Sequence, residues 1–325
     1  MDRVMVSICC VTYNHEKYIA EAIESFLMQD TNFDYEILIH DDASTDKTAE
    51  IIKEYQNRYP NIIKPICQVE NQYSKGVKVS QLNRERAKGK YIALCEGDDY
   101  WTDKTKLQKQ VDFMEKNNEF SLCVHAGEKV NNKGKRIYPM RPYQSDRVCT
   151  TSEVILGGGD MFPTNSMFFK KQHTETMPKF YSISPVGDYP LVIYLSLVGK
   201  VYYFDKIMSA YRVGVAGSWN NRVSSNVDKA TEHYYLMKKV MHELNLYTNK
   251  IYENEILEVN NRGKLNILCM NRKYKEIKNG ELKDYYKKLH YCKKIGTYIR
   301  CKAPKQYITI RNLLRKFNYG KIKQK

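Results

Sequence analysis

The sequence predicts an α/β fold in which a mostly parallel, doubly wound sheet is followed by a helical C-terminal extension. Up to residue 125, short apolar runs alternate with stretches in which apolar residues recur every three or four positions. This alternation indicates parallel strands, because each parallel connection needs a crossover helix. Beyond residue 228 the apolar spacing is helical, as at Tyr234, Met237, Met241 and Leu244.

The individual elements follow from the same spacing. The apolar run at 4–11 predicts a strand that is buried on both faces. Other apolar runs predict strands at 36–40, 62–69, 91–95, 121–125, 167–170 and 201–204. Pro65 places the third strand near an edge, because proline cannot donate to a strand ladder. Helical spacing predicts helices that bury residues between 19 and 27 and between 51 and 59, and helices over about 78–88, 104–117 and 189–197.

Charge is distributed unevenly along the chain. The net charge is +16, but residues 286–325 hold 13 Lys/Arg and no Asp/Glu, whereas residues 1–285 hold 40 basic and 37 acidic residues. The nearly neutral main part disfavours nucleic-acid binding, and the basic tail suits an anionic surface. Solvated helices are the simpler explanation of the tail. An apolar face at 307–317 leaves contact with anionic lipid open as an alternative of equal weight.

The cellular compartment is suggested by what the sequence lacks. No run reaches the roughly 20 apolar residues of a membrane span, and the N-terminus has no signal-peptide pattern. The nine cysteines include no Cys-x-x-Cys pair, which favours reduced, mostly buried thiols. We therefore expect a cytoplasmic protein, peripheral on the inner face of the cell membrane if the tail binds lipid.

Three polar clusters follow three predicted strands. They are Thr12-Tyr13-Asn14, Asp41-Asp42 and Glu96-Gly97-Asp98-Asp99. The carboxyl ends of parallel strands share one crevice, where ligands of open α/β sheets bind. Carboxylates gathered there repel one another, and a divalent cation that also binds phosphate relieves the repulsion. Neither Gly-x-Gly-x-x-Gly nor a P-loop is present, so side chains would have to hold a nucleotide.

These clusters resemble the signatures of a known family. The segments Val-Ser-Ile-Cys-Cys-Val-Thr-Tyr-Asn, Ile-Leu-Ile-His-Asp-Asp-Ala-Ser-Thr-Asp and Gly-Lys-Tyr-Ile-Ala-Leu-Cys-Glu-Gly-Asp-Asp-Tyr-Trp occur in the order and spacing of family 2 glycosyltransferases with the GT-A fold. The resemblance covers roughly residues 4–220. It implies a GT-A catalytic domain over 1–222 and a helical, basic C-terminal region over 223–325.

The resemblance also implies roles for individual residues. The donor, a nucleotide-sugar, would be bound by Thr12, Tyr13, Asp41, Asp42, Asn83, Arg84, Asp98 and Arg212. Asp42 matches the acid that reads uracil, and Arg212 could meet the diphosphate. Asp98 and Asp99 match the acids that hold Mn²⁺ or Mg²⁺, with Asp99 expected as the direct ligand. A histidine is usual two residues after Arg212, but Gly214 stands there.

The catalytic base implied by the resemblance is Asp188, in Val-Gly-Asp-Tyr-Pro. Asp188 would take a proton from an acceptor hydroxyl, whose direct attack inverts the anomeric centre. Trp101, Asn165 and Ser166 are candidates for contact with the acceptor. Simpler roles remain open: Asp41 or Asp188 could cap the following helix, and Trp101 could be a packing residue.

The resulting hypothesis is a metal-dependent inverting glycosyltransferase, a hexosyl- or N-acetylhexosaminyl-transferase. It would use a nucleotide-sugar, most simply a UDP-sugar, and a glycan or lipid-linked acceptor in surface polysaccharide biosynthesis. The alternatives are a polyprenyl-phosphate sugar synthase and a non-catalytic sugar-nucleotide-binding protein. Retention of Asp42, Asp98, Asp99 and Asp188 together argues against the last.

Overall fold

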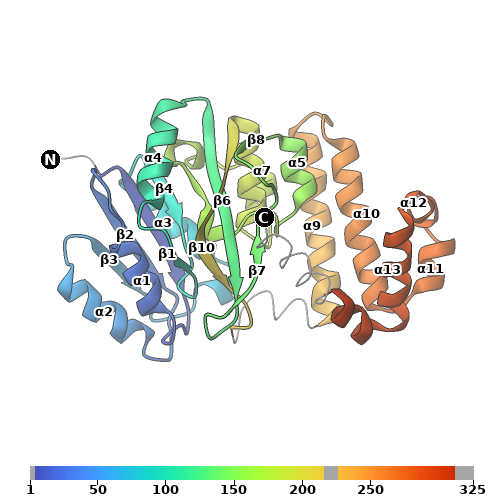
Figure 1. The fold of residues 1–325 in the computed structure, drawn as a ribbon, viewed down its shortest axis with the longest axis horizontal. Helices are drawn as coiled ribbons and strands as arrows, with labels where there is room; N and C mark the ends of the chain where they lie inside the picture. The colour runs from blue at the N-terminus through green and yellow to red at the C-terminus, as the bar shows by residue number, and fades with distance from the viewer. Residues whose placement is uncertain (1–3, 216–225, 312–325) are drawn as a thin grey trace. The chain divides into compact units, whose positions relative to one another are not determined.

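A computed structural model of the chain describes residues 4–215 and 226–311 (Figure 1). They form two compact units: the first comprises the described residues up to Pro178 and Val186–Val213, and the second comprises Lys179–Pro185 and the described residues from Gly214 onward. The domain boundary predicted between residues 222 and 223 lies outside the described residues.

The first unit is built on one mixed sheet. Its strands are β1 (Val6–Thr12), β2 (Tyr35–Asp41), β3 (Ile63–Cys67), β4 (Tyr91–Leu94), β5 (Tyr100–Trp101), β6 (Phe120–Val130), β7 (Arg136–Met140), β8 (Arg147–Cys149), β9 (Phe168–Lys170) and β10 (Lys200–Arg212). The order is β3-β2-β1-β4-β9-β6-β10-β5, with β7 on β6 and β8 on β10. β3 therefore lies at an edge, as Pro65 predicted.

Parallel pairing dominates the half of the sheet that carries the predicted polar clusters. β1 pairs in parallel with both β2 and β4, and β2 pairs in parallel with β3. The prediction missed that β9 runs antiparallel between β4 and β6. A three-residue strand carries no directional signal in its sequence, which is why its orientation could not be predicted.

Helices cover the sheet of the first unit (Figure 1). They are α1 (Ile19–Leu27), α2 (Thr48–Arg58), α3 (Val79–Arg86), α4 (Lys106–Lys116), α5 (Thr151–Gly157) and α7 (Asp188–Val198), with short 3₁₀ turns η1 (Tyr73–Lys75), η2 (Thr164–Ser166) and η3 (Lys171–Thr174). The core beneath them is dominated by β-branched and aromatic residues, such as Ile8, Ile37, Phe26 and Tyr91, none of which is exposed. The α/β fold predicted from the sequence is confirmed.

Two strands extend well beyond their predicted ends. β6 continues to Val130 and β10 to Arg212, whereas the apolar runs end near His125 and Phe204. Polar residues such as Glu128 and Ser209 interrupt the apolar pattern but remain buried, because β6 and β10 pair in parallel over this stretch. This extension brings Arg212 to the carboxyl end of the sheet.

The second unit is helical, as predicted for the C-terminal extension. It contains α6 (Lys179–Ser182), α9 (Val227–Tyr247), α10 (Glu253–Met270), α11 (Tyr274–Asn279), α12 (Lys283–Lys288) and α13 (Tyr291–Lys302). Leu268, Ile277, Leu282 and Tyr286 belong to a small core of their own. The apolar face predicted at 307–317 falls largely outside the described residues. Among the residues described, no helix is long and apolar enough to cross a membrane.

Candidate active site

The three polar clusters meet at the carboxyl ends of β1, β2 and β4, as predicted. Thr12 and Asp41 are register partners across β1 and β2. The backbone N–H of Asp42 donates to the carbonyl of Thr12 at 3.0 Å, and the N–H of Gly97 donates to the carbonyl of Val11 at 2.9 Å. A Cβ at Gly97 would lie 2.6 Å from Thr12 Oγ1, so only glycine allows this approach.

The loops after β1 and β2 are tied to each other. Asn14 donates its backbone N–H to Ser44 Oγ at 2.8 Å, and Asn14 Oδ1 accepts from the N–H of Thr45 at 2.8 Å. His15 donates its N–H to Thr48 Oγ1 at 2.8 Å. Two loops 30 residues apart in sequence therefore form one rigid rim.

Ala43 occupies an unfavourable backbone conformation within this rim. Its φ is +63°, in the left-handed region that costs a residue with a Cβ about 1 kcal/mol or more. Ala43→Gly should therefore stabilise the protein by up to about 1 kcal/mol, less the extra entropy that glycine gives the unfolded chain. Urea unfolding would measure this. A loss of stability greater than 0.5 kcal/mol (about the size of neutral surface changes) would contradict the strain.

Asp41 and Asp42 point into the protein. Asp41 is 1% exposed and accepts hydrogen bonds from the hydroxyl and the N–H of Ser44. Burial raises the pKa of Asp41, and the Ser44 donors partly offset that rise. Asp42 is 2% exposed, and its two oxygens accept from the N–H groups of Gln72 at 2.7 Å and Tyr73 at 3.0 Å. Both carboxylates thus hold loops in this structure, which argues against direct reading of a base.

Other residues expected to bind the donor also prove to be buried. Asn83 is fully buried and donates to the carbonyls of Cys10 at 2.8 Å and Leu38 at 3.0 Å, bridging β1 and β2. Arg84 is 4% exposed and Thr12 only 1%. Tyr13, by contrast, is 45% exposed, which makes it the member of this group most accessible to a nucleoside.

The two aspartates of the Glu96–Asp99 turn have different environments. Asp99 is 1% exposed, and its oxygens accept from Asn165 Nδ2 at 3.0 Å and from the Arg212 N–H at 2.7 Å. Burial, with the charges of Asp98 and Glu96, raises the pKa of Asp99, and the Arg212 N–H opposes the rise. Asp98 keeps a partly exposed carboxylate, and Glu96 is exposed. The accessible acids of the turn are therefore Glu96 and Asp98.

Arg212 holds this turn from the end of β10. Its Nε donates to the carbonyl of Asp98 at 2.8 Å, and its Nη2 pairs with Glu21 Oε2 at 2.5 Å. The guanidinium lies 4.6 Å from the ring centre of Tyr18 and 5.3 Å from that of Tyr100. Arg212 is only 5% exposed, so contact with a diphosphate would require it to exchange Glu21 for the ligand.

The three residues considered for acceptor contact are buried beneath the turn. Trp101 is 1% exposed, and its indole N–H donates to the carbonyl of Asn165 at 2.9 Å. Phe26 packs edge-on against its ring, and Lys106 Nζ lies 4.0 Å from the ring centre. Asn165 and Ser166 are fully buried. This burial argues against acceptor contact and supports the packing role for Trp101.

Asp188 is the first residue of α7 and remains partly exposed. Its Oδ1 accepts from the N–H of Tyr189 at 2.7 Å, and Thr164 Oγ1 donates to its Oδ2 at 3.3 Å. Gly187, not Asp188, holds the N-cap position, so Asp188 does not cap the helix in the usual way. Burial raises the pKa of Asp188, and its hydrogen bonds lower it in part.

The charges of the acids in the Glu96–Asp99 turn and of Asp188 influence the same side chain, Tyr211. Burial raises the pKa of Tyr211, and the charges of Glu96, Asp99, Asp98 and Asp188 raise it further. Desolvation by the surrounding protein, together with the charges of Asp98 and Asp188, raises the pKa of Glu96 to about 8. The adjacent residues Thr164 and Asn165 of η2 contact Asp188 and Asp99 respectively, so the turn and the candidate base lie at one site.

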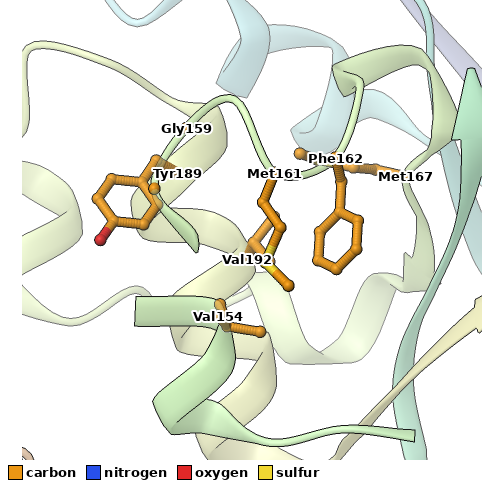
Figure 2. A pocket seen from close by; sticks show the side chains of 8 residues that line it. Val154, Gly159, Met161, Phe162, Met167, Tyr189 and Val192 are labelled. Atoms are coloured by element: carbon orange, nitrogen blue, oxygen red, sulfur yellow. The ribbon is translucent and has the colours of Figure 1, made fainter. Parts of the chain in front are cut away.

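A small apolar pocket lies beside this site. Figure 2 shows its lining, which comes from α5, α7 and the segment over residues 158–167: Val154, Gly158, Gly159, Met161, Phe162, Met167, Tyr189 and Val192. Tyr189, which directly follows Asp188, brings the first turn of α7 to the pocket. We assign the pocket no role.

The accessible acids fit a cation that is shared with a ligand. Across residues 4–215 and 226–311, no three His, Cys, Asp or Glu side chains are grouped to hold a metal by themselves. Mg²⁺ is commonly bound by only one or two carboxylates together with substrate phosphates. Glu96 and Asp98 can supply those carboxylates, since Glu96 is exposed and Asp98 is partly exposed, whereas Asp99 is buried.

Three neighbours of the site were missed by sequence reasoning. His15 Nε2 lies 3.9 Å from Asp98 Oδ2, Glu21 pairs with Arg212, and Thr164 donates to Asp188. His15 follows the first polar cluster directly, which was a usable signal. No local pattern marks Glu21 or Thr164, because their partners Arg212 and Asp188 lie 191 and 24 residues away in sequence.

The chain belongs to glycosyl transferase family 2. The model of this family matches residues 7–173, the part that supplies β1, β2, β4 and the Glu96–Asp99 turn. A Mycobacterium tuberculosis protein whose function is uncharacterized is 34% identical over 221 residues, which are 66% of this chain and 61% of that protein. The chain thus aligns with less than two thirds of that relative's length.

Two further comparisons concern proteins whose names state a ligand or a reaction. The Escherichia coli UDP-Glc:alpha-D-GlcNAc-diphosphoundecaprenol beta-1,3-glucosyltransferase WfaP is 39% identical over 34% of this chain and 41% of its own. The structure of S. aureus TarS 1–349 in complex with UDP-GlcNAc matches with a TM-score of 0.59 and 18% identity, over 92% of this chain and 79% of that one. At this identity the likeness shows the fold alone.

Proposed function

We propose that this chain is a metal-dependent inverting glycosyltransferase that moves a sugar from a UDP-sugar to a hydroxyl of a glycan or lipid-linked acceptor. The observation that carries the proposal is that η2, through Thr164 and Asn165, joins the partly exposed Asp188 to the turn that presents Glu96 and Asp98, in a chain of family 2. We infer surface polysaccharide biosynthesis as the process, since the name of the similar WfaP gives a lipid-linked sugar, GlcNAc-diphosphoundecaprenol, as acceptor.

Asp98, assisted by Glu96, is the residue we propose to hold Mn²⁺ or Mg²⁺. This reverses the expectation that Asp99 is the direct ligand, because Asp99 is only 1% exposed and is held in place by hydrogen bonds from Asn165 and Arg212. The bound cation would neutralise the charge that develops on the leaving diphosphate. Asp99 would instead fix the turn, so that Asp98 faces the donor.

Asp188 is the residue we propose as general base. Ionised Asp188 accepts the proton of the acceptor hydroxyl as its oxygen attacks the anomeric carbon, and the bond to the diphosphate breaks. The N-terminus of α7 favours the ionised form, and Thr164 orients one carboxylate oxygen. A single displacement of this kind inverts the anomeric configuration.

The nucleotide can be identified by binding. A thermal-shift screen of UDP-, GDP- and dTDP-sugars with Mn²⁺ should give the largest stabilisation with a UDP-sugar, because a ligand that binds only the folded state raises its melting temperature. Two UDP-sugars, glucose and N-acetylglucosamine, separate hexosyl from N-acetylhexosaminyl transfer. A larger shift with GDP- or dTDP-sugars would reject UDP as the nucleotide while leaving the fold and base assignments standing.

Two alternatives are less well supported. A polyprenyl-phosphate sugar synthase would use a lipid phosphate as acceptor, which does not need a base to deprotonate a hydroxyl. The partly exposed Asp188, a base that a phosphate acceptor would not need, favours a hydroxyl acceptor instead. A non-catalytic nucleotide-sugar-binding protein would have no use for a partly exposed acid at the start of α7.

We propose that the C-terminal region binds an anionic membrane surface. On α13 the residues Tyr291, Ile295 and Tyr298 are 71%, 41% and 48% exposed, and they recur at helical spacing. Lys302 continues this row, and no acidic residue follows Asp284. Aromatic and aliphatic side chains flanked by lysine suit the interface of an anionic bilayer.

Deletion of residues 300–325 should reduce co-sedimentation with vesicles containing anionic phosphatidylglycerol, because it removes most of the basic excess. Vesicles of neutral phosphatidylcholine serve as the control and should bind both proteins weakly. Equal binding of the full and shortened chains to the anionic vesicles would rule out this role for residues 300–325.

A further inference from the structure

The turn between β6 and β7 forms a rigid, basic hairpin tip. Asn131 Oδ1 accepts from the N–H groups of Lys133 at 3.0 Å and Lys135 at 2.9 Å. The Gly134 N–H donates to the carbonyl of Asn131 at 2.9 Å, and the φ of Gly134 is +74°, which glycine adopts without strain. The backbone of this tip is therefore fixed by its own hydrogen bonds.

The tip presents positive charge that the protein does not neutralise. Lys133 and Lys135 are exposed, and within the described residues neither pairs with a carboxylate. Arg136 follows and pairs with Glu128 at 3.0 Å. Two lysines that have fixed backbones and no acidic partner are suited to bind an anion as point charges.

The hairpin tip adjoins the candidate active site. Arg212 Nη1 lies 3.5 Å from the carbonyl of Asn131, and a Cβ on Gly134 would lie 3.9 Å from Tyr100 Oη and 4.0 Å from Arg212 Nη1. Because β6 and β10 run parallel, the end of β6 and the end of β10 meet at the edge of the sheet that carries the site. The β6–β7 turn lies near the lower edge of the view in Figure 1.

We infer that Lys133 and Lys135 bind a phosphate group of the acceptor, so that the substrate class is a phosphate-bearing acceptor rather than a neutral glycan. This inference rests on the proposed glycosyl transfer, because it needs an acceptor to reach the same site. The donor's diphosphate is assigned to the cation at Asp98 and to Arg212, which adjoins the tip, so the two lysines are available for a second anion. A lipid diphosphate and a glycan phosphodiester share this chemistry.

Binding of a water-soluble prenyl diphosphate tests the inference. Calorimetric titrations of the full chain would use farnesyl diphosphate, farnesol and glycerophosphoglycerol, each with UDP and Mn²⁺ present to fill the donor's diphosphate site. We expect K133A/K135A to weaken binding of the phosphate probe by about tenfold, through the loss of two charged contacts. Binding of UDP should stay within twofold of wild type.

A matched pair of exposed lysines supplies the control. Lys53 on α2 and Lys116 at the end of α4 also form no ion pair among the described residues, and K53A/K116A should bind all probes as wild type does. Preference for farnesyl diphosphate would identify a lipid-linked source, and preference for glycerophosphoglycerol a glycan source.

Several results would overturn the inference. They are unchanged phosphate binding in K133A/K135A, equal binding of farnesol, no phosphate binding by wild type, and loss of UDP binding in K133A/K135A, which would assign the tip to the donor. Failure of UDP itself to bind wild type would instead count against the proposed function, so the two failures can be told apart.

Discussion

Asp188→Asn is expected to abolish sugar transfer while leaving donor binding nearly unchanged. An amide cannot accept the proton of the acceptor hydroxyl, and loss of a general base costs about 10²–10⁴ in rate. The amide oxygen can still accept from the Tyr189 N–H or from Thr164, so the fold should persist. Transfer kinetics and calorimetric titration with UDP, performed on the same preparation, measure the two effects.

The matched control is Asp160→Asn. Asp160 also raises the pKa of Asp188 through its charge, but its side chain is 90% exposed and it pairs only with Lys129 in the described structure. It should transfer sugar at close to the wild-type rate. If Asp188→Asn lost donor binding and transfer equally, the base assignment would be wrong.

The protonation of Asp188 also sets the expected pH profile. Because burial raises the pKa of Asp188 above the usual value for aspartate, the ionised base is lost at a higher pH than for an exposed acid. The acidic limb of kcat should therefore lie above pH 4, an approximate bound taken from ordinary aspartate. Transfer rates from pH 4 to 8 at saturating donor would locate it.

Asp98→Asn and Asp99→Asn are expected to fail in different ways. Asp98→Asn removes the accessible ligand and should weaken activation by Mn²⁺ by about tenfold or more, with little effect on stability. Asp99→Asn replaces a buried acceptor of two N–H bonds by an amide whose NH₂ would face a donor. This should cost about 1–3 kcal/mol of stability.

Manganese titrations of activity and urea unfolding, applied to both variants, separate these outcomes. Asn165→Ala provides a third point, since it removes a donor to Asp99 Oδ2 and should resemble Asp99→Asn rather than Asp98→Asn. The reverse pattern, in which Asp99→Asn loses metal activation at full stability, would restore Asp99 as the ligand.

Local sequence pattern was sufficient to predict the strands that position the site. β1, β2 and β4 are short apolar runs that end at polar clusters, and parallel pairing then requires their carboxyl ends to meet. Because the polar clusters follow these strands, the sequence also predicted that their acidic side chains gather at the carboxyl ends of the strands. Pairing partners for β9, β7 and β8 carry no comparable signal, because those strands are short or interrupted by polar residues.

The roles of adjacent acids could not be predicted from the sequence. Asp98 and Asp99 have the same side chain, and what distinguishes them is the contact of Asp99 with Asn165 and Arg212, which lie 66 and 113 residues away. Asp42 was expected to read a base, but the N–H groups of Gln72 and Tyr73 occupy its oxygens. Burial by distant segments decides which acid reaches solvent, and no local pattern encodes it.

Release of UDP from a UDP-sugar tests the central claim most directly. The full chain, supplied with Mn²⁺ and UDP-glucose or UDP-N-acetylglucosamine, should release UDP slowly to water, and chelation by EDTA should stop the release. Asp98→Asn and Asp188→Asn should both be deficient in the same assay. Release that persists unchanged in EDTA would contradict metal dependence, and the absence of both release and binding for UDP-, GDP- and dTDP-sugars would contradict the glycosyltransferase assignment itself.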